Sequence, residues 1–278
     1  MTDLRSEYLA MMDVFARCVE AVCGKTVRGD SAFEADTQPL ATKLFFHLGS
    51  VFHLQEGTSL PRIAEGPAHF IDFPSISILM RAAFETYLTF QFIFVQPTSV
   101  EERKFRHTVW VLGGLLDRQR FTTTTPEGKT KLQEEKAQID GLRQSILSSP
   151  VYAQLPEPRR KEAKAGKWRL GKQWVDIAEL FGTHREYFVS LYAYLSSYAH
   201  TNYLSVLQLS QAHEKDHQSS LAGIYTYVGM TLMSHFILVY CSLFQEAQRV
   251  LDEDQDSINL LKVYYVKAED WEALIKRA

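Results

Sequence analysis

Apolar residues recur along most of the chain at intervals of three and four residues, the spacing that gathers them on one face of an α-helix. Helices are therefore predicted over residues 2–22, 39–55, 75–95, 99–121, 174–181, 185–209 and 217–251, with a last one near Trp271. Runs that favour a strand are short and occur only at 92–95 and 263–266. The pattern predicts an all-α protein built as a multi-helix bundle.

The segment 75–95 differs from the other predicted helices because apolar residues occupy nearly every side of it. A helix that is apolar all round is normally buried, so this one is expected to be the long central buried helix of the bundle. Pro97 ends it.

The predicted connections are rich in Pro, Gly and polar residues. Residues 25–37 indicate a loop, and 56–74 an irregular connection. Residues 127–147 are highly charged, which predicts an exposed helix or hairpin arm. Three Pro and two Gly within 148–172 predict a long basic surface loop. A single helical domain over residues 1–278 is expected.

One stretch has the length of a membrane span. Residues 219–245 contain no Asp, Glu, Lys or Arg, and about 20 apolar residues suffice to cross a bilayer. The stretch also carries Tyr, Thr, Ser and His side chains, which are costly against lipid and easy to satisfy inside a bundle. A buried core helix is therefore favoured, and no membrane partner is expected.

Composition and charge narrow the possible class of protein and its possible partners. Apolar residues make up 46% of the chain and charged residues 23%, which fits a globular protein with a substantial core. The net charge of −3 excludes a global field that would attract nucleic acid, so such binding would need a local patch. Cys18, Cys23 and Cys241 form no C-x-x-C pair, so we expect no disulfide framework and a cytoplasmic location.

The central helix carries a polar stripe, which we call the first polar stripe: Ser77, Arg81, Glu85 and Thr89. These residues are four apart and therefore share one helical face. An Arg and a Glu in so apolar a helix need partners, because an unpaired buried charge is very costly. A structural ion pair is favoured, and a ligand or catalytic site is the alternative.

A second polar stripe consists of Tyr192, Ser196 and His200, again four residues apart. A lone His on an apolar helix is more often a hydrogen-bonded structural residue than a catalyst, although its titration range permits acid–base chemistry. Ser196 and His200 would suggest a nucleophile and its base. The sequence around them contains no recognisable oxyanion loop or orienting carboxylate, so a hydrolase is disfavoured.

The segment from His213 to His217 matches H-E-x-x-H, the pattern by which some metalloproteases bind zinc. Its middle residues are Lys and Asp and its flanks are polar, which is typical of a solvated linker and not of a buried zinc helix. Glu246 would be the third ligand, but no motif surrounds it. We therefore expect no metal and no cofactor.

Cations gather in the segment 157–172 together with one Trp. Basic side chains interleaved with an aromatic ring can bind phosphates and stack a base, although most such runs are simply solvated. The candidate nucleic-acid-binding residues are Arg159, Arg160, Lys161, Lys164, Lys167, Trp168 and Arg169.

The two stripes resemble motifs of a bacterial family of uncharacterised helical proteins that is loosely HEPN-like. The resemblance covers about residues 70–208. Its first motif, S-x-x-x-L-x-R-x-x-x-E, is carried here by Ser75, Leu79, Arg81 and Glu85. Its second motif, Y-x-x-L-S-x-x-x-H, is carried by Tyr192, Leu195, Ser196 and His200.

The resemblance implies a helical fold and a homodimer more than it implies RNA cleavage. Active HEPN nucleases are similar to one another in an Arg with four to six residues between it and a His. The positions that would hold this Arg ahead of His200 are Ala193, Tyr194 and Leu195, so the motif is absent. Arg81, on a different predicted helix, is the residue that would have to supply the missing charge.

Two functions follow as hypotheses, and the sequence leaves open whether the protein is an enzyme. The favoured one is a non-catalytic binding or interaction protein with an internal polar cluster. The alternative is a metal-independent ribonuclease or RNA-binding protein of the HEPN-like type, in which His200 transfers protons and Arg81 stabilises phosphate charge. Both hypotheses use the same residues: Arg81, Glu85, Tyr192, Ser196 and His200. Both require the two stripes to meet in space.

Overall fold

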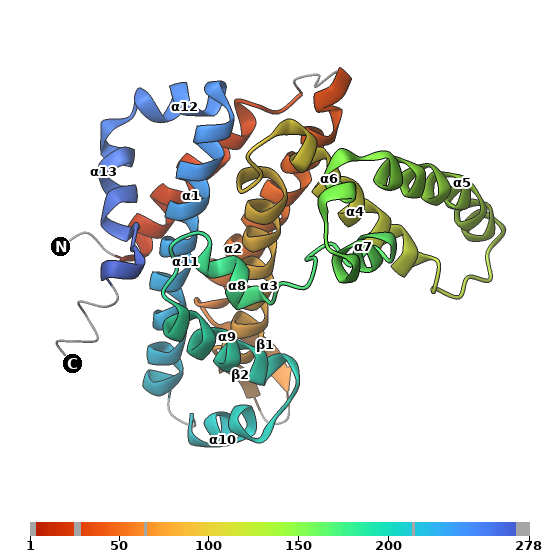
Figure 1. The fold of residues 1–278 in the computed structure, drawn as a ribbon. Helices are drawn as coiled ribbons and strands as arrows, with labels where there is room; N and C mark the ends of the chain where they lie inside the picture. Colours follow the sequence, from red (N-terminus) through yellow and green to blue (C-terminus); the bar gives the residue numbers. More distant parts are fainter. Residues whose placement is uncertain (1–3, 25–28, 64–65, 213–214, 271–278) are drawn as a thin grey trace. The chain divides into compact units, whose positions relative to one another are not determined.

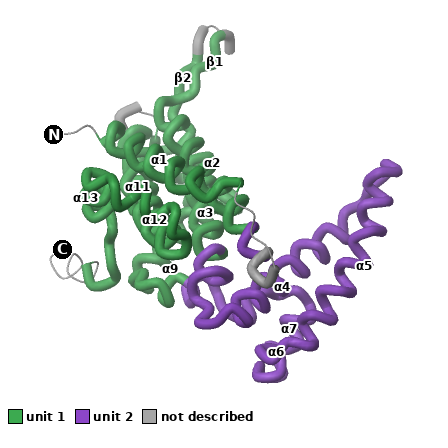
Figure 2. Tube along the Cα trace, turned by 90° about the horizontal axis from the view of Figure 1, so that it is seen from above, with its two compact units in different colours: residues 1–26, 36–89, 178–278 green, residues 27–35, 90–177 purple. Residues whose placement is uncertain are grey.

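The computed structural model describes residues 4–24, 29–63, 66–212 and 215–270, and most of them are helical, which confirms the predicted all-α, multi-helix class. Two compact units make up the chain (Figure 2). Unit 1 comprises residues 1–26, 36–89 and 178–278, and unit 2 comprises residues 27–35 and 90–177. The expectation that the whole chain folds as a single domain stays a prediction.

Unit 1 holds both chain ends and most of the helices (Figure 1). Its elements are α1 (Leu4–Glu20), α2 (Thr37–Leu54), β1 (Thr58–Ile63), β2 (Gly66–Phe70), α3 (Phe73–Phe90), α9 (Arg185–Ala199), α10 (Tyr203–Gln211), α11 (Lys215–Leu243), α12 (Gln245–Asp252) and α13 (Gln255–Tyr264). The short helix α8 (Trp174–Glu179) lies where unit 2 ends and unit 1 resumes.

The core of unit 1 forms where α1 packs against α2 and α11. The ring of Phe15 on α1 lies 4.8 Å from that of Phe236 on α11, and both side chains are fully buried. The buried Tyr8 hydroxyl donates to the main-chain oxygen of Leu48 at 2.9 Å, which satisfies a polar group that burial would otherwise penalise. Cys18 and Cys241 are buried free thiols, and Cys23 is an exposed one.

The predicted central helix corresponds to α3 and continues into a short π-helical segment, η2 (Gln91–Val95). Ile76, Met80 and Ala83 of α3 are fully buried, as the apolar pattern requires. The β-leaning run at 92–95 is therefore helical. Phe92, Ile93 and Phe94 are buried, and local β-propensity is weak against such tertiary packing.

The connection predicted as irregular, 56–74, contains instead an antiparallel hairpin of β1 and β2. Thr58 pairs with Phe70 and Leu60 with Ala68. Each strand of a two-stranded sheet is an edge, so Pro61 and Pro67 are tolerated although neither can donate to a ladder. Because of these prolines, the sequence pattern did not predict the two strands.

Several predicted helix ends are shifted or interrupted. The helix expected over 217–251 is broken at Phe244 into α11 and α12, and the helix expected over 185–209 is broken into α9 and α10. Residues 255–264 form α13, between the end of the helix expected over 217–251 and the one expected near Trp271. Of the last predicted helix, near Trp271, residues 268–270 are described and are helical, and residues from 271 on lie outside the described residues.

Two helical stretches, Phe73–Val95 and Gln218–Leu243, are long and apolar enough to cross a membrane. In each, 61% of the most apolar window is buried inside the protein. Length and composition alone are weak evidence for a span, because core helices of soluble proteins have both.

Unit 2 comprises η1 (Gly29–Asp36), η2, α4 (Val100–Arg118), α5 (Pro126–Ser148), α6 (Pro150–Gln154) and α7 (Glu157–Lys164), with Asp36 itself in unit 1. The expectation of a loop over 148–172 is wrong for its first part, which contains α6 and α7. Pro150 and Pro158 lie in the first turns of these helices, where a missing N–H costs nothing. Prolines interpreted as breakers therefore mark helix starts.

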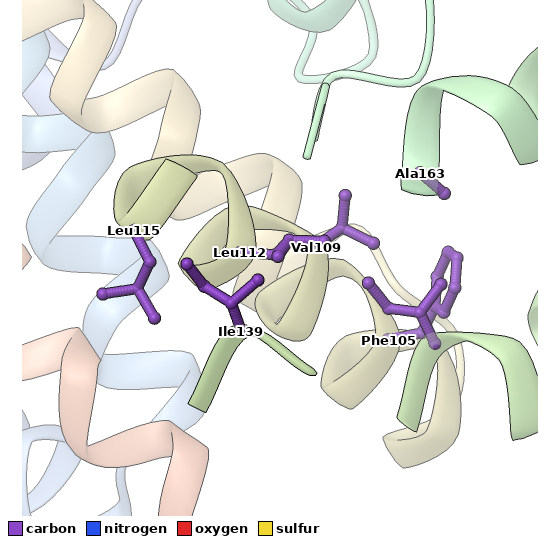
Figure 3. Close-up of a cluster of buried hydrophobic side chains, with 7 residues drawn as sticks. Phe105, Val109, Leu112, Leu115, Ile139 and Ala163 are labelled. Atoms are coloured by element: carbon purple, nitrogen blue, oxygen red, sulfur yellow. The ribbon is translucent and has the colours of Figure 1, made fainter. Parts of the chain in front are cut away.

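The core of unit 2 lies between α4 and the helices that follow it (Figure 3). Phe105, Val109 and Leu112 project from one face of α4 at helical spacing and are buried. Ile139 of α5 and Ala163 of α7 pack against this face. The amphipathic pattern of α4 and the sparse apolar positions of α5 are explained by this shared core.

Helix α4 makes an unusually close backbone contact with the turn after α7. A side chain at Gly113 would place its Cβ 2.4 Å from the main-chain oxygen of Gly166. Gly166 also has a φ of +69°, in the left-handed region that favours glycine. Both glycines are therefore required for this approach, whereas Gly114, one residue along, faces open space.

Gly166→Ala is expected to lower the free energy of unfolding by at least about 1–2 kcal/mol, because Ala is strained in the left-handed region and its Cβ meets the backbone of Gly113. Gly114→Ala is the matched control, and it should stabilise α4 by roughly 0.5–1 kcal/mol. Urea unfolding followed by circular dichroism measures both changes. Equal stabilities of the two variants would contradict the proposed contact.

An ion pair joins α1 to α13 in unit 1. Asp254 is the N-cap of α13 and accepts from the Ser257 amide at 3.0 Å and the Ser257 hydroxyl at 2.6 Å. Arg17 of α1 donates to the same carboxylate at 2.6 Å. These Ser257 hydrogen bonds, together with Arg17, lower the pKa of Asp254 to about 2.

A carboxylate with a lowered pKa in the folded state stabilises the fold above its ordinary pKa and loses that effect as the pH falls through the folded value. Asp254 should therefore contribute stability above pH 3.8 that is lost as the pH falls to about 2. We expect Asp254→Ala to flatten the fall in urea midpoint over this interval. An unchanged pH dependence in the variant would show that the contacts of Asp254 with Arg17 and Ser257 contribute little to stability.

Candidate functional site

The first polar stripe lies on one face of α3, but its four residues have different roles. The hydroxyl of Ser77 donates to the main-chain oxygen of Phe73 at 2.8 Å, and that of Thr89 donates to the main-chain oxygen of Glu85 at 2.6 Å. Both hydroxyls are thus hydrogen-bonded within the helix, and the Ser77 hydroxyl is also hydrogen-bonded to the hydroxyl of Tyr225 on α11. The charged pair in the middle of the stripe needs partners from another helix.

Helix α9 supplies those partners, so the two polar stripes meet. The Tyr192 hydroxyl donates to Glu85 Oε1 at 2.5 Å. Arg81 Nε donates to the same oxygen at 3.1 Å, and Arg81 Nη1 lies 3.1 Å from His200 Nε2. We call Arg81, Glu85, Tyr192 and His200 the Arg81–His200 cluster. Residues more than a hundred positions apart thus form one hydrogen-bonded chain.

The cluster lies at the boundary between core and solvent. The side chains of Arg81 and Glu85 are 22% and 33% exposed, and His200 is an exposed residue. An ion pair sealed in the core would be expected to serve packing alone. Here one end of the hydrogen-bonded chain reaches solvent, so the cluster is accessible to a ligand.

The charges of the cluster are set by its own contacts. Burial, followed by the hydrogen bond to Glu85, raises the pKa of Tyr192 to about 12, so its hydroxyl is protonated and donates. Burial by itself lowers the pKa of Arg81, but Tyr192 and Glu85 together outweigh it and raise that pKa. The guanidinium also lies over the Tyr192 ring, with Cζ 5.2 Å from the centroid. Arg81 is therefore a fixed cation.

The contact with Arg81 determines the tautomer of His200. A guanidinium has only donors, so Nε2 of His200 must accept, and the ring proton then resides on Nδ1. Within the part of the chain that the structure describes, Nδ1 has no hydrogen-bond partner. It remains a donor for solvent or for a ligand.

A tight corner between α9 and α10 holds His200 in place. His200 is the C-cap of α9, and the amide of Asn202 donates back to the main-chain oxygen of Ser197 at 3.2 Å. Between them Thr201 adopts a φ of +50°, a left-handed conformation that is rare for a β-branched residue. Asn202 then caps α10 by accepting from the Ser205 amide.

This corner is the feature that the periodicity of residues 185–209 did not reveal. The apolar spacing continues through it, so a single helix was expected there. Asn202 was the available signal, because Asn favours N-caps. Strain of the kind seen at Thr201 is often retained next to functional residues.

Ser196 belongs to the second stripe but not to the hydrogen-bonded chain. Its hydroxyl donates to the main-chain oxygen of Tyr192 at 2.6 Å, one turn earlier in α9. The hydroxyl therefore supports the helix next to Tyr192, and within the described residues it is not hydrogen-bonded to the His200 imidazole. The geometry gives no support to a Ser–His nucleophile and base.

The candidate nucleic-acid-binding residues lie in unit 2, on α7 and the turn that follows. Arg159 pairs with Glu162 at 2.8 Å and Arg160 with Glu157 at 3.4 Å, so these two cations are partly neutralised. Lys161, Lys164 and Lys167 are exposed, and Lys164 Nζ lies 5.8 Å from the centroid of the Tyr152 ring. Trp168 and Arg169 are half-buried.

His213 and Glu214, which begin the H-E-x-x-H match, lie outside the described residues. Among the residues that are described, no group of three or more His, Cys, Asp or Glu side chains could hold a metal ion.

Comparison with known proteins gives a family but no function. A model of the family of unknown function DUF5677 matches residues 70–218, which is 149 of the 278 residues and includes both polar stripes. No curated protein and no solved structure matches the chain. Since the match covers more than half of its length and includes both polar stripes, the chain belongs to the DUF5677 family of unknown function.

Proposed function

We propose that this protein binds a phosphate-bearing ligand at the Arg81–His200 cluster and acts as a binding protein. The observation that carries the proposal is the 3.1 Å contact between Arg81 Nη1 and His200 Nε2 at the edge of the core. Two of the five guanidinium N–H groups are used within the cluster, and Nδ1–H of His200 is a further donor. Donors around a fixed cation favour an oxyanion.

Glu85 and Tyr192 position the cation in this proposal. Glu85 accepts from both Arg81 and Tyr192 through one oxygen, which fixes the guanidinium and leaves it charged. A positioned cation loses little side-chain entropy when a ligand binds, which favours affinity. The strained Thr201 beside His200 also supports a functional role for this corner.

His200→Ala should weaken the binding of inorganic phosphate by about 10-fold or more, because a hydrogen bond to a charged group contributes about 1.5–3 kcal/mol. His200 is exposed, so the fold should be unaffected. His53→Ala is the matched control, since the His53 side chain is 83% exposed on α2 and lies outside the cluster. Isothermal titration calorimetry measures both affinities. Equal binding by wild type and His200→Ala would overturn the proposal.

The same contact favours a second candidate function, metal-independent RNA cleavage of the HEPN-like type. The Arg that is absent from positions 193–195 has a counterpart in Arg81, which approaches His200 from α3. In this reaction Arg81 would turn from His200 Nε2 to the phosphate and stabilise the phosphorane charge, and the freed Nε2 would take the proton of a ribose 2′-hydroxyl. The 2′-oxygen bonds to phosphorus as the bond to the 5′-oxygen breaks, and solvent protonates the leaving oxygen.

Wild-type protein should then convert single-stranded RNA into fragments with 2′,3′-cyclic phosphate ends in the presence of EDTA. His200→Ala and Arg81→Gln should each slow cleavage by at least about 100-fold, since acid–base catalysis contributes about 10²–10⁴-fold. His53→Ala, purified in parallel, should cleave like wild type and so controls for contaminating nuclease. RNA that stays intact after long incubation with wild type would reject cleavage while leaving phosphate binding standing.

A further inference from the structure

Unit 2 contains a cavity of about 630 Å³ between α4 and the turn after α7. Its lining includes Trp110, Gly114, Arg120, Lys167, Trp168 and Lys172. This volume falls within the range of about 300–1,000 Å³ that is usual for small-ligand sites. The cavity is formed by unit 2 alone and shares no residue with the Arg81–His200 cluster.

The lining of this cavity is cationic although the chain as a whole carries a net charge of −3. Four cations, Arg120, Lys167, Arg169 and Lys172, face two acids, Asp117 and Glu162, which leaves 4 − 2 = +2. Glu162 is already paired with Arg159 at 2.8 Å, outside the lining, and Asp117 with Arg120 at 3.1 Å, within it. Lys167 is exposed and has no ion pair in the part of unit 2 that the structure describes. The excess of positive charge favours an anionic ligand.

Two aromatic rings, Trp110 and Trp168, belong to the apolar part of the lining, and Trp168 is held by neighbouring rings. The Trp168 indole lies 6.0 Å from the Phe92 ring and 5.8 Å from the Trp174 ring. Arg169 in turn covers Trp174, with Cζ 4.8 Å from the centroid. A rigid indole offers a planar surface at low entropic cost, which suits the stacking of an aromatic group.

The backbone keeps the cavity open. The contact between Gly113 and Gly166 fixes the turn against α4, and Leu170 and Gly171 in the wall both have positive φ, +50° and +78°. A left-handed Leu is uncommon and strained. Gly114 contributes no side chain, and its missing Cβ would meet no atom within 4 Å. The wall is therefore shaped by the backbone.

We propose that this cavity binds a nucleotide unit, with its base against the Trp168 indole and its phosphate beside Lys167 and Arg120. Cations alone would suit any anion, and the held aromatic ring adds recognition of a base. The nucleotide unit can come from a free mononucleotide or from single-stranded RNA, and both present the same chemistry. The proposal does not depend on phosphate binding at the Arg81–His200 cluster.

Gly114→Leu tests the site because it fills the cavity from a position with open space. Gly141→Leu on α5 is the matched control: Gly141 is also exposed, helical and free of neighbours within 4 Å, and it does not line the cavity. We expect wild type to bind adenosine monophosphate or an oligoadenylate RNA with quenching of tryptophan fluorescence. Gly114→Leu should weaken that binding at least 10-fold and Gly141→Leu less than 2-fold.

Lys167→Ala keeps the test valid if Gly114→Leu fails to fold, since Lys167 is exposed. It should weaken nucleotide binding several-fold and reduce its salt dependence, whereas Lys161→Ala, an exposed cation outside the cavity, should do neither. His200→Ala should leave nucleotide binding unchanged, which separates this site from the Arg81–His200 cluster.

The outcomes are distinct. Binding of the mononucleotide supports a free ligand, and binding of the oligoadenylate alone supports an RNA strand. In the His200→Ala variant, which lacks the imidazole of the Arg81–His200 cluster, inorganic phosphate bound as tightly as the nucleotide would overturn recognition of the base. Absence of binding to either nucleotide probe, or binding that Gly114→Leu and Lys167→Ala both leave intact, would overturn the site.

Discussion

Arg81 and Glu85 lie on one of the two long apolar helices of unit 1, and a helix of this kind can hold charges only if other side chains satisfy them. Helix α9 does so, through the hydroxyl of Tyr192 and the imidazole of His200. This requirement ties α9 to α3 in one orientation, because hydrogen bonds are directional where apolar packing is not. The same bonds present a positioned cation and a histidine near solvent.

The position of His200 depends on how α9 ends. If α9 continued into α10 as a single helix, His200 would be one more position on its surface. The left-handed Thr201 and the N-cap at Asn202 instead end α9 at Ala199 and turn the chain. The strain at Thr201 is offset by the hydrogen bonds of the corner, and the imidazole is left at the helix end beside Arg81.

Unit 2 shows the same dependence of a site on close backbone geometry. Gly113 and Gly166 let α4 and the turn after α7 approach more closely than any side chain would permit. That approach leaves a cavity lined by cations and tryptophans from segments that the sequence separates by about fifty residues. Three cations of the segment 157–172, Lys167, Arg169 and Lys172, thus line a cavity. Arg159 and Arg160 lie outside its lining and are paired with neighbouring glutamates.

The sequence by itself determined the all-α class, the buried α3 and the polar residues that share a face on α3 and α9, because each follows from spacing along one helix. It missed the hairpin of β1 and β2, the helices α6 and α7, and the corner at Thr201. In the hairpin and in the first turns of α6 and α7 the chain contains prolines, and at the corner Thr201 adopts a left-handed conformation. The spacing of apolar residues does not report either feature. Only the tertiary structure decided that Arg81 meets His200 and that unit 2 encloses a cavity. Both depend on contacts between distant segments, and local spacing carries no information about such contacts.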